Sequence, residues 1–362
     1  MSILDNVQNL MLLEQLISGN VVSVNISALS NILNKHRNTI KKKVDTIFEH
    51  AILDRPIYPF PGLYKLYPLL VVLQCHLPDN QKIIKWVKED PYIFAAFTSR
   101  QGEYDHLLFI YHESITSYQL WVDSLSSILQ VEYGVAKDDA TLVCHSTYFS
   151  NQLMIKYSPH SGIYLLEKDF EEQGRLTINE HDFDSDDLQI MKCLVSGQGI
   201  KINEKLLGQK TGLHRKTIEK RIATLHNEGI IGRPVCRFSK FFVPPNYVLT
   251  YSLFEIKKNY RTIQKQIIED PHIPIALKIH HEQYNLLIFG NHRTIGDHLL
   301  WEENYRKRFP HSFGRAHITY LSPKMTISFD QQIVSMCLIQ EKIGRLQGKE
   351  LRKTIEPILN NL

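Results

Sequence analysis

The chain contains two copies of one sequence pattern, and this internal duplication limits the folds open to it more than any other feature. Residues 36–56 align without a gap on residues 214–234, and nine of the 21 positions are identical, where composition alone gives about one or two. Residues 89–121 align on residues 269–301 at nearly the same offset, and 12 of these 33 positions agree. A unit of roughly 180 residues has therefore been duplicated, and we expect both copies to fold alike.

Each copy opens with three short helical patterns. We expect these helices near residues 8–18, 25–33 and 36–49 in the first copy, and near 185–195, 203–210 and 214–227 in the second. Apolar residues recur three and four positions apart, which places them on one face of each helix. Asn34 and Gly212 follow the second helix, and Asn and Gly adopt most readily the left-handed backbone conformation that ends a helix. This order predicts a helix-turn-helix in each copy.

The remainder of each copy predicts a wing and then a sheet domain. An Arg-Pro pair, Arg55-Pro56 or Arg233-Pro234, and a short β-prone stretch follow the third helix, which is the pattern of a winged helix. Strand and helix patterns then alternate in the order β-α-β-β-α-β. They lie near residues 68–76, 79–88, 92–99, 104–112, 115–129 and 140–148, and again near 247–256, 258–268, 272–280, 284–291, 293–308 and 315–322. This is the order of the ferredoxin-like motif, whose helices cover one face of an antiparallel sheet.

The predicted fold class is therefore α+β, with two winged helix-turn-helix domains and two ferredoxin-like (βαββαβ) domains in tandem. The predicted domains are a first winged helix-turn-helix (1–62), a first ferredoxin-like ligand-sensing domain (63–180), a second winged helix-turn-helix (181–242), a second ferredoxin-like ligand-sensing domain (243–328) and a C-terminal helical tail (329–362). The tail begins FDQQIVSMCLIQ, which is similar to FDSDDLQIMKCL at 183–194. It is either the remnant of a third first helix or a helix for association.

Composition argues against several classes of protein. Charged residues make up 22% and hydrophobic residues 43% of the 362 residues, as in ordered globular proteins. Five cysteines without a CxxC pair argue against a disulfide framework and a zinc ribbon, and they favour a cytoplasmic location. The pattern shows no signal peptide, no transmembrane run, and no metal, phosphate-loop or nucleophile motif. We therefore expect no metal, no cofactor, no membrane partner and no enzymatic activity.

The third helix of each copy carries a basic face opposite its apolar one. The candidate DNA-binding residues are His36, Arg37, Asn38, Lys41, Lys42, Lys43 and Arg55 in the first copy, and His214, Arg215, Lys216, Lys220, Arg221 and Arg233 in the second. Lys and Arg neutralise phosphates, and an Arg at the start of such a helix reaches guanine O6 and N7. A solvated helix face is the alternative, but recurrence in both copies favours DNA contact. Glu219 replaces the equivalent Lys41, which predicts unequal affinity for the two half-sites.

A helix-turn-helix followed by a βαββαβ domain resembles the Lrp/AsnC (feast/famine) family of prokaryotic and archaeal transcriptional regulators. The segment GlyGluTyrAspHisLeuLeu at 102–108 is similar to the Gly-x-Tyr-Asp sensing turn of that family, whereas the second copy has Glu282-Gln283-Tyr284-Asn285. The resemblance implies a small-molecule effector, such as an amino acid, bound by Gly102, Tyr104, Asp105, Tyr284 and Asn285. Core packing is the other interpretation of the two tyrosines. The two turns are not expected to bind one ligand equally.

Family members of this type usually carry one copy per chain and pair through their sheet domains. The resemblance therefore implies an intramolecular pseudo-dimer that presents two recognition helices to double-stranded DNA. It also implies that further chains can join to form a homo-oligomer. The leading hypothesis is a sequence-specific transcriptional regulator.

Two other functions stay open from the sequence. The segment HHEQYNLLIF at 280–289 is similar to a His-rich strand of siroheme-type tetrapyrrole decarboxylases, which are enzymes with the same arrangement of domains. A basic third helix kept in both copies argues against that function. An architectural DNA-compacting protein is the second alternative, and it would bind DNA with little sequence preference.

Overall fold

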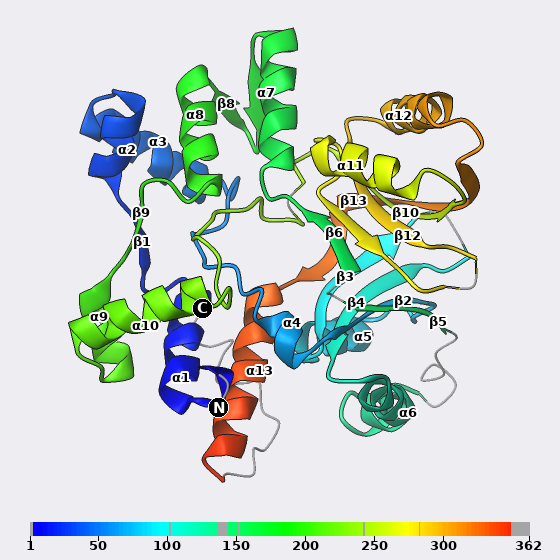
Figure 1. The fold of residues 1–362 in the computed structure, drawn as a ribbon, viewed down its shortest axis with the longest axis horizontal. Coiled ribbons are helices and arrows are strands. Elements are labelled where there is room, and N and C mark those ends of the chain that lie inside the picture. The colour runs from blue at the N-terminus through cyan, green and yellow to red at the C-terminus, as the bar shows by residue number, and fades with distance from the viewer. Residues whose placement is uncertain are drawn as a thin grey trace. The chain divides into compact units, whose positions relative to one another are not determined.

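The computed structural model describes residues 3–100, 103–136, 144–150, 153–241, 243–281 and 283–348. It forms two compact units, shown in Figure 1. Unit 1 comprises Met1–Lys65, Glu167–Ser239 and Asp330–Leu362, and unit 2 comprises Leu66–Leu166 and Lys240–Phe329. Unit 1 gathers the helix-turn-helix segments of both copies and unit 2 gathers both ferredoxin-like domains, so the fold class is α+β as predicted. The domain boundaries given above stay predictions.

The helices of unit 1 agree with the sequence pattern to within one or two residues. The first copy forms α1 (Val7–Ile17), β1 (Val22–Val24), α2 (Ile26–Leu33) and α3 (Arg37–Glu49), and the second forms α8 (Ser185–Val195), β9 (Ile200–Ile202), α9 (Glu204–Thr211) and α10 (Arg215–Asn227). Asn25 and Asn203 cap α2 and α9, each accepting a backbone hydrogen bond on its side-chain oxygen. Asn34 and Gly212 end these helices in the left-handed conformation, with φ of 48° and 70°.

The first helix of each copy packs against helices of the other copy. α8 contacts α2 and α3, while α1 contacts α9. The two copies cross where β1 and β9 pair antiparallel, with Val22 opposite Ile202. Gly199 at this crossing has φ of +71°, and a Cβ there would lie 2.5 Å from Leu29 Cγ of α2. Each helix-turn-helix is thus completed by a helix that the other copy supplies.

The predicted wing segments pair with each other rather than forming long hairpins. Leu53 bridges to Phe238 and Ile57 bridges to Val235, both antiparallel. Arg237 is 2% exposed, and its guanidinium binds Asp54 (3.2 Å) from the first copy. These contacts fasten the segment after α3 to the segment after α10.

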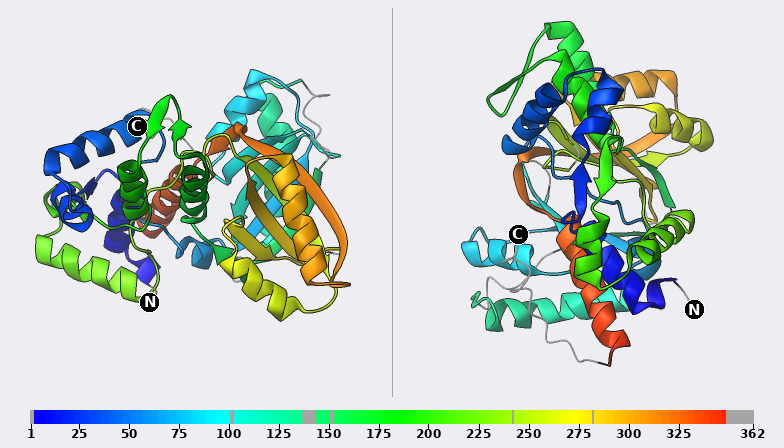
Figure 2. Two further views of the ribbon diagram at one scale, coloured as in Figure 1. Left: turned by 90° about the horizontal axis from the view of Figure 1, so that it is seen from above. Right: turned by 90° about the vertical axis from the view of Figure 1, so that its left-hand side faces the viewer.

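Several further elements lie wholly or partly in unit 1 and, apart from the tail helix, have no counterpart among the sequence predictions. They are the 3₁₀ turn η1 (Ile3–Asp5), the short helix α4 (Leu63–Leu66), α7 (Ser161–Gln173), the hairpin β7 (Leu176–Ile178) and β8 (His181–Phe183), and α13 (Gln331–Leu346) in the predicted tail. α13 lies alongside α1 in Figure 2, and Gln340 donates to Glu14 (2.6 Å). Lys192 of α8, at the position equivalent to Glu14, pairs with Glu167 of α7 at 2.7 Å. α13 is therefore the counterpart of α7, a helix that packs on a first helix.

Unit 2 contains one continuous antiparallel sheet with helices on it. The first copy forms β2 (Leu69–Cys75), α5 (Gln81–Glu89), β3 (Ile93–Ser99), β4 (His106–His112), α6 (Ile115–Val131) and β5 (Cys144–Ser150). The second forms β10 (Val248–Ile256), α11 (Tyr260–Glu269), β11 (Ile275–Lys278), β12 (Leu286–His292), α12 (Ile295–Arg308) and β13 (Phe313–Phe329). The strand order is β5-β2-β4-β3-β13-β10-β12-β11-β6, where β6 is Met154–Tyr157. Each copy thus has the strand order of a ferredoxin-like sheet.

Strand β13 joins the two ferredoxin-like sheets because it is longer than predicted. Its first part pairs with β10, where Thr319 lies opposite Tyr251, and its last part pairs with β3, where Phe329 lies opposite Ala95. One apolar core lies between the first sheet and its helices α5 and α6, and a second lies between the other sheet and α11 and α12. The opposite, inner faces of the two sheets meet at Phe109 and Phe289.

Candidate nucleic-acid interface

A histidine caps the third helix of each copy. The Nδ1 atom of His36 accepts a hydrogen bond from the backbone N–H of Asn38 (3.2 Å), and His214 Nδ1 accepts from Lys216 (3.3 Å). In a neutral imidazole this places the proton on Nε2. Both exposed rings therefore present an N–H donor at a helix N-terminus, where backbone amides and the helix dipole favour anions such as phosphate.

The two third helices bury one face and expose the other. Their inner residues are at most 7% exposed: Ile40, Val44, Ile47, Ile218, Ile222 and Leu225. Most of the predicted DNA-binding side chains are exposed: His36, Arg37, Asn38, Lys41, Lys42, His214, Arg215, Lys216 and Lys220. Arg55 and Arg233 are also exposed, in the paired segments that follow the helices. The structure therefore leaves a basic surface accessible on α3 and on α10.

Two of the predicted DNA-binding residues are held by contacts within the protein. Lys43 Nζ binds Asp184 (2.6 Å) and Asp187 (3.1 Å) at the start of α8. Arg221, its equivalent in α10, donates to Asn9 and, through Nη2, to Gln8 (2.6 Å) at the start of α1. Both cations therefore fasten a third helix to the first helix of the other copy.

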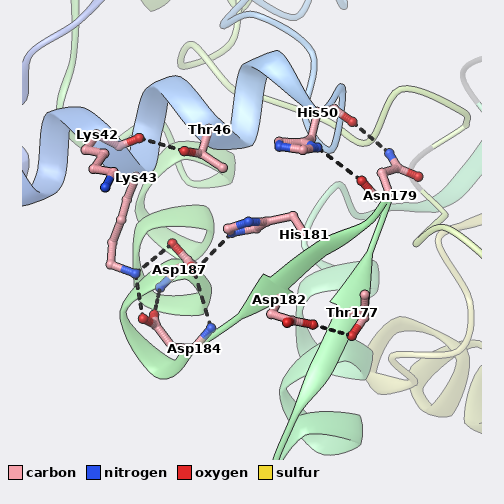
Figure 3. A network of polar contacts seen from close by, with 10 residues as sticks. All are labelled: Lys42, Lys43, Thr46, His50, Thr177, Asn179, His181, Asp182, Asp184 and Asp187. Carbon is pink, nitrogen blue, oxygen red and sulfur yellow. Dashed lines mark hydrogen bonds and ion pairs between the residues drawn. The ribbon is translucent and has the colours of Figure 1, made fainter.

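The contacts of Lys43 belong to a wider polar network, drawn in Figure 3. Asp187 is 1% exposed, and it accepts from the backbone N–H of Asp184 and lies 3.3 Å from His181 Nε2. At the C-terminal end of α3, His50 and Asn179 exchange two hydrogen bonds of 2.8 and 3.1 Å. Helix α8 thus holds the middle of α3, and the β7–β8 hairpin holds its C-terminal end.

Burial and charge have opposite effects on the pKa values of Lys43 and Asp184. Burial lowers the pKa of Lys43, but hydrogen bonds and attraction from Asp184 and Asp187 outweigh it, so the pKa rises above its usual value. Burial raises the pKa of Asp184, but the hydrogen bond from Lys43 and backbone amides hold the pKa below its usual range. Lys43 and Asp184 are therefore both charged at neutral pH, as an ion pair requires.

The first turn of α10 differs from that of α3 in its charge partners. Arg215 Nε contacts Glu204 at the start of α9 and Glu219 one turn further along α10, the latter at 3.1 Å. Within the described part of the chain, Arg37 makes no ion pair. The sequence pattern pointed to Glu219 but not to Glu204. The signal available was its position, directly after the Asn203 cap and therefore next to the turn that leads into α10.

The predicted ligand-sensing residues lie at the ends of the strand pairs in unit 2. Asp105 accepts from the backbone N–H of Leu77 (3.2 Å) and contacts His106 (2.5 Å). Burial raises the pKa of the Asp105 carboxyl, but hydrogen bonding and the charge of His106 outweigh it and lower the pKa. Asn285 accepts from the N–H of Ile256 and donates to its carbonyl, both at 2.9 Å. Each side chain thus hydrogen-bonds to the backbone at or just after the end of a neighbouring strand.

The aromatic residues of these turns are half-buried beside histidines. Tyr104 lies against His76 and Tyr284 against His281, with ring centroids 5.2 and 5.3 Å apart. His281 Nε2 also lies 2.9 Å from His145 Nε2 of the first copy. Gly102, the remaining predicted ligand-binding residue, lies outside the described residues. The sequence analysis did not place His145 and His281 together, because they come from different copies.

Comparison with known proteins shows no family for this chain. No protein-family model matches the chain, and no curated protein matches its sequence. Two crystal structures of the siroheme decarboxylase NirDL, one with an iron-uroporphyrin III analogue, align with TM-scores of 0.49 and 11% identity. The alignments cover 89% and 94% of this chain, and 93% and 100% of those chains. LrpC of B. subtilis aligns with 44% of this chain and 90% of its own, at a TM-score of 0.25 and 13% identity.

At these identities and TM-scores the likeness shows neither a family nor a function for this chain. One expectation has to be corrected. No enzymatic activity was expected from the sequence, but the NirDL structures, which align with most of this chain, are structures of an enzyme. The exclusion was wrong because it depended on the absence of familiar catalytic motifs and on the basic helices of unit 1, and neither constrains the chemistry of unit 2. Among the described residues, no helix is long and apolar enough to cross a membrane.

Proposed function

We propose that the chain is a DNA-binding transcriptional regulator whose helices α3 and α10 contact double-stranded DNA. The observation that supports this most directly is the exposure of the same basic residues on both helices, opposite faces that are almost completely buried. Lys41 and Lys42 are the clearest candidates for phosphate contacts, because each releases counterions when it neutralises a phosphate. Arg37 and Asn38 lie in the first turn of α3, from which base edges are reached.

The exchange of first helices supports a joint action of the two helix-turn-helix domains. α3 is fastened to α8 and α10 to α1, and β1 pairs with β9 between them. The two domains are thus tied at several points in unit 1, as the two subunits of a dimeric regulator are. In this proposal unit 1 acts as an intramolecular pseudo-dimer on two half-sites. Association into a homo-oligomer stays a prediction.

Effector sensing by unit 2 is the remaining part of this proposal. Tyr104, Asp105, Tyr284 and Asn285 lie at the strand ends of the two ferredoxin-like domains, and the tyrosines are half-buried. A small polar molecule such as an amino acid would exchange hydrogen bonds with the side chains that now clasp the strands. Thermal unfolding in the presence of each amino acid tests this, and a rise in melting temperature that Asp105→Ala abolishes is the expected result.

DNA binding is tested by fluorescence anisotropy with a labelled random duplex between about 50 and 200 mM salt. The variant K41Q/K42Q removes two exposed lysines of α3. We expect the slope of log affinity against log salt to become shallower by about 1.8, since each lost phosphate contact contributes about 0.9. The charge-matched control K85Q/K88Q removes two exposed lysines of α5 and leaves the slope unchanged. Absence of duplex binding by the wild-type chain at the lowest salt rejects the proposal.

A second candidate function is chemistry on a tetrapyrrole, and one observation favours it. The imidazoles of His145 and His281 meet at 2.9 Å between their Nε2 atoms, and imidazole nitrogens are the usual protein ligands of haem-type iron. Addition of siroheme to the purified chain tests this. A shift of its absorbance bands that H145A/H281A abolishes, with release of CO₂, supports an enzyme. An unchanged spectrum argues against it.

A further inference from the structure

The guanidinium of Arg215 lies between two carboxylates on the exposed face of α10. Its Nε contacts Glu204 Oε2 from α9 and Glu219 Oε1 from the next turn of α10 (3.1 Å). The side chain is nevertheless 70% exposed, and Glu219 is 47% exposed. Both contacts are made by Nε, and among the described residues Nη1 and Nη2 donate no hydrogen bond to either carboxylate. These are the groups with which arginine contacts guanine O6 and N7 in a bidentate manner.

The first copy provides a natural comparison at the same positions. Arg37 is equivalent to Arg215, but Ile26 stands in place of Glu204 and Lys41 in place of Glu219. In the described chain Arg37 makes no ion pair, and Lys41 and Lys42 are exposed beside it. Among the described residues, the start of α3 thus carries cations without a carboxylate partner, whereas at the start of α10 Arg215 lies between two carboxylates, with the exposed Lys216 next to it.

These two arrangements act differently on a duplex. Cations on long side chains attract any phosphate, so α3 gains affinity at every sequence. Carboxylates repel phosphates, so α10 loses affinity wherever its contacts with bases do not compensate for that repulsion. The two carboxylates already restrict the Arg215 side chain, so it loses less conformational entropy when it contacts a base. A carboxylate next to it is an acceptor for the cytosine N4 amine, which belongs to the same base pair as guanine.

We infer that α10 is the sequence-discriminating half of the DNA interface, with Arg215 contacting the guanine of a G·C pair. Glu204 and Glu219 act as positioning residues that orient Arg215 and penalise other sequences. Helix α3 supplies affinity that tolerates sequence. This inference rests on the proposed DNA-binding function and adds to it the base pair that is recognised and the residues that select it.

Selection from random duplex DNA tests the inference, combined with anisotropy on the selected and the random duplex. For the wild-type chain we expect one half-site with a fixed G·C pair and one with weak preference. The variant E204Q/E219Q should bind random duplex at least about fivefold more tightly and lose the G·C preference. The charge-matched control E171Q/E172Q, in two exposed residues of α7, should change neither the sequence preference nor the random-duplex affinity.

Two further variants separate orientation from charge alone. Arg215→Lys keeps the positive charge but loses the planar fork, so it should lose the G·C preference while random-duplex affinity stays within about twofold. The reciprocal exchange I26E/K41E should weaken random-duplex binding and introduce a G·C preference in the second half-site. All substituted side chains lie at or near the surface of the helix-turn-helix domains, and circular dichroism checks that the variants remain folded.

The outcomes distinguish this inference from the proposed function. If the wild-type chain binds duplex DNA but E204Q/E219Q selects the same sequence with the same affinity, the inference is overturned and the DNA-binding proposal stands. If E204Q/E219Q binds more tightly yet keeps the G·C preference, the carboxylates only lower affinity and the inference is again wrong. If the wild-type chain binds no duplex, both are rejected.

Discussion

Phe109 and Phe289 occupy equivalent positions in the two copies, and their rings meet with centroids 5.2 Å apart. Both are buried, and Phe241 lies beside each of them. The contact joins the inner faces of the two ferredoxin-like sheets. It gives the physical reason for duplication within one chain, because the apolar face that each sheet cannot leave in water is covered by the other.

Truncation of this contact should destabilise unit 2 strongly. Phe289→Ala is expected to lower the free energy of unfolding by about 3–5 kcal/mol, because a buried aromatic ring is lost and a cavity remains. Urea denaturation followed by circular dichroism measures this. Leu300→Ala, at a side chain 60% exposed on α12, is the control and should change the free energy by less than about 0.5 kcal/mol. If Phe289→Ala lowers the free energy of unfolding no more than Leu300→Ala does, the inner faces of the two sheets do not stabilise each other.

The crossing of β1 and β9 predicts a specific sensitivity at Gly199. Gly199→Ala places a Cβ 2.5 Å from Leu29 Cγ at a positive φ, so it combines a steric clash with a backbone penalty. We expect a loss of about 2–5 kcal/mol in the free energy of unfolding of unit 1. Gly174→Ala is the matched control, since Gly174 has φ of +69° and nothing within 4 Å of the added Cβ. It should cost only the backbone penalty of about 1–2 kcal/mol, and equal losses in the two variants would argue against the tight crossing.

Local patterns in the sequence were sufficient for most elements of the fold. The spacing of apolar residues and the caps predicted α8 with the bounds that the structure has, Ser185–Val195, and the outward direction of Arg37 and Lys42. The exchange of first helices was not predictable in this way. The two copies offer similar apolar surfaces, so the sequence of α1 fits either pair of helices. The choice depends on how the chain crosses at Gly199.

The same reason explains what the sequence analysis missed in the candidate site. It counted Lys43 and Arg221 among the DNA-binding residues because both lie on basic helices. Their partners, at the starts of α8 and α1, are distant in sequence and belong to the other copy. Glu204 and Arg215 likewise come from different helices. The charge pattern along one helix predicts which residues face away from the core. It does not predict which of these residues form ion pairs or hydrogen bonds with distant segments of the chain.

Acid should destabilise unit 2 through two equivalent histidines at the ends of β4 and β12. Burial lowers the pKa of His112 to about 4 and, together with the neighbouring His298 and His272, that of His292 to about 2. In the unfolded chain both titrate near 6.5. Below this pH the unfolded state binds more protons than the folded state, so the stability present above pH 6.5 is lost as the pH falls. Between about pH 6.5 and 4 each histidine should remove about 1.4 kcal/mol per pH unit.

Urea denaturation at about pH 7.5 and about pH 5.5 measures this dependence. His292→Phe replaces the imidazole with a ring that does not titrate, and it should reduce the loss of stability over that interval by about 1.4 kcal/mol. At the higher pH, the difference in free energy of unfolding between His292→Phe and the wild-type chain measures the change in packing alone, which provides the control. A wild-type stability that is constant between the two pH values would contradict the assignment of buried, neutral histidines.

Lys42 and Lys43 are neighbours on α3, yet their surroundings differ. Lys42 is exposed, whereas Lys43 binds Asp184 and the almost fully buried Asp187. Lys43→Gln should therefore lower the free energy of unfolding by about 1–3 kcal/mol, because it leaves a buried carboxylate without its cation. Lys42→Gln should leave stability unchanged within about 0.5 kcal/mol.

The effect on DNA binding should be the opposite. Lys42→Gln is expected to make the salt dependence shallower by about 0.9, the contribution of one phosphate contact, while Lys43→Gln leaves it unchanged. Each variant is thus the control for the other, since both remove one positive charge from adjacent positions of the same helix. Equal changes in the salt dependence would mean that Lys43 leaves Asp187 to contact the duplex. The network in Figure 3 would then be a feature of the DNA-free chain alone.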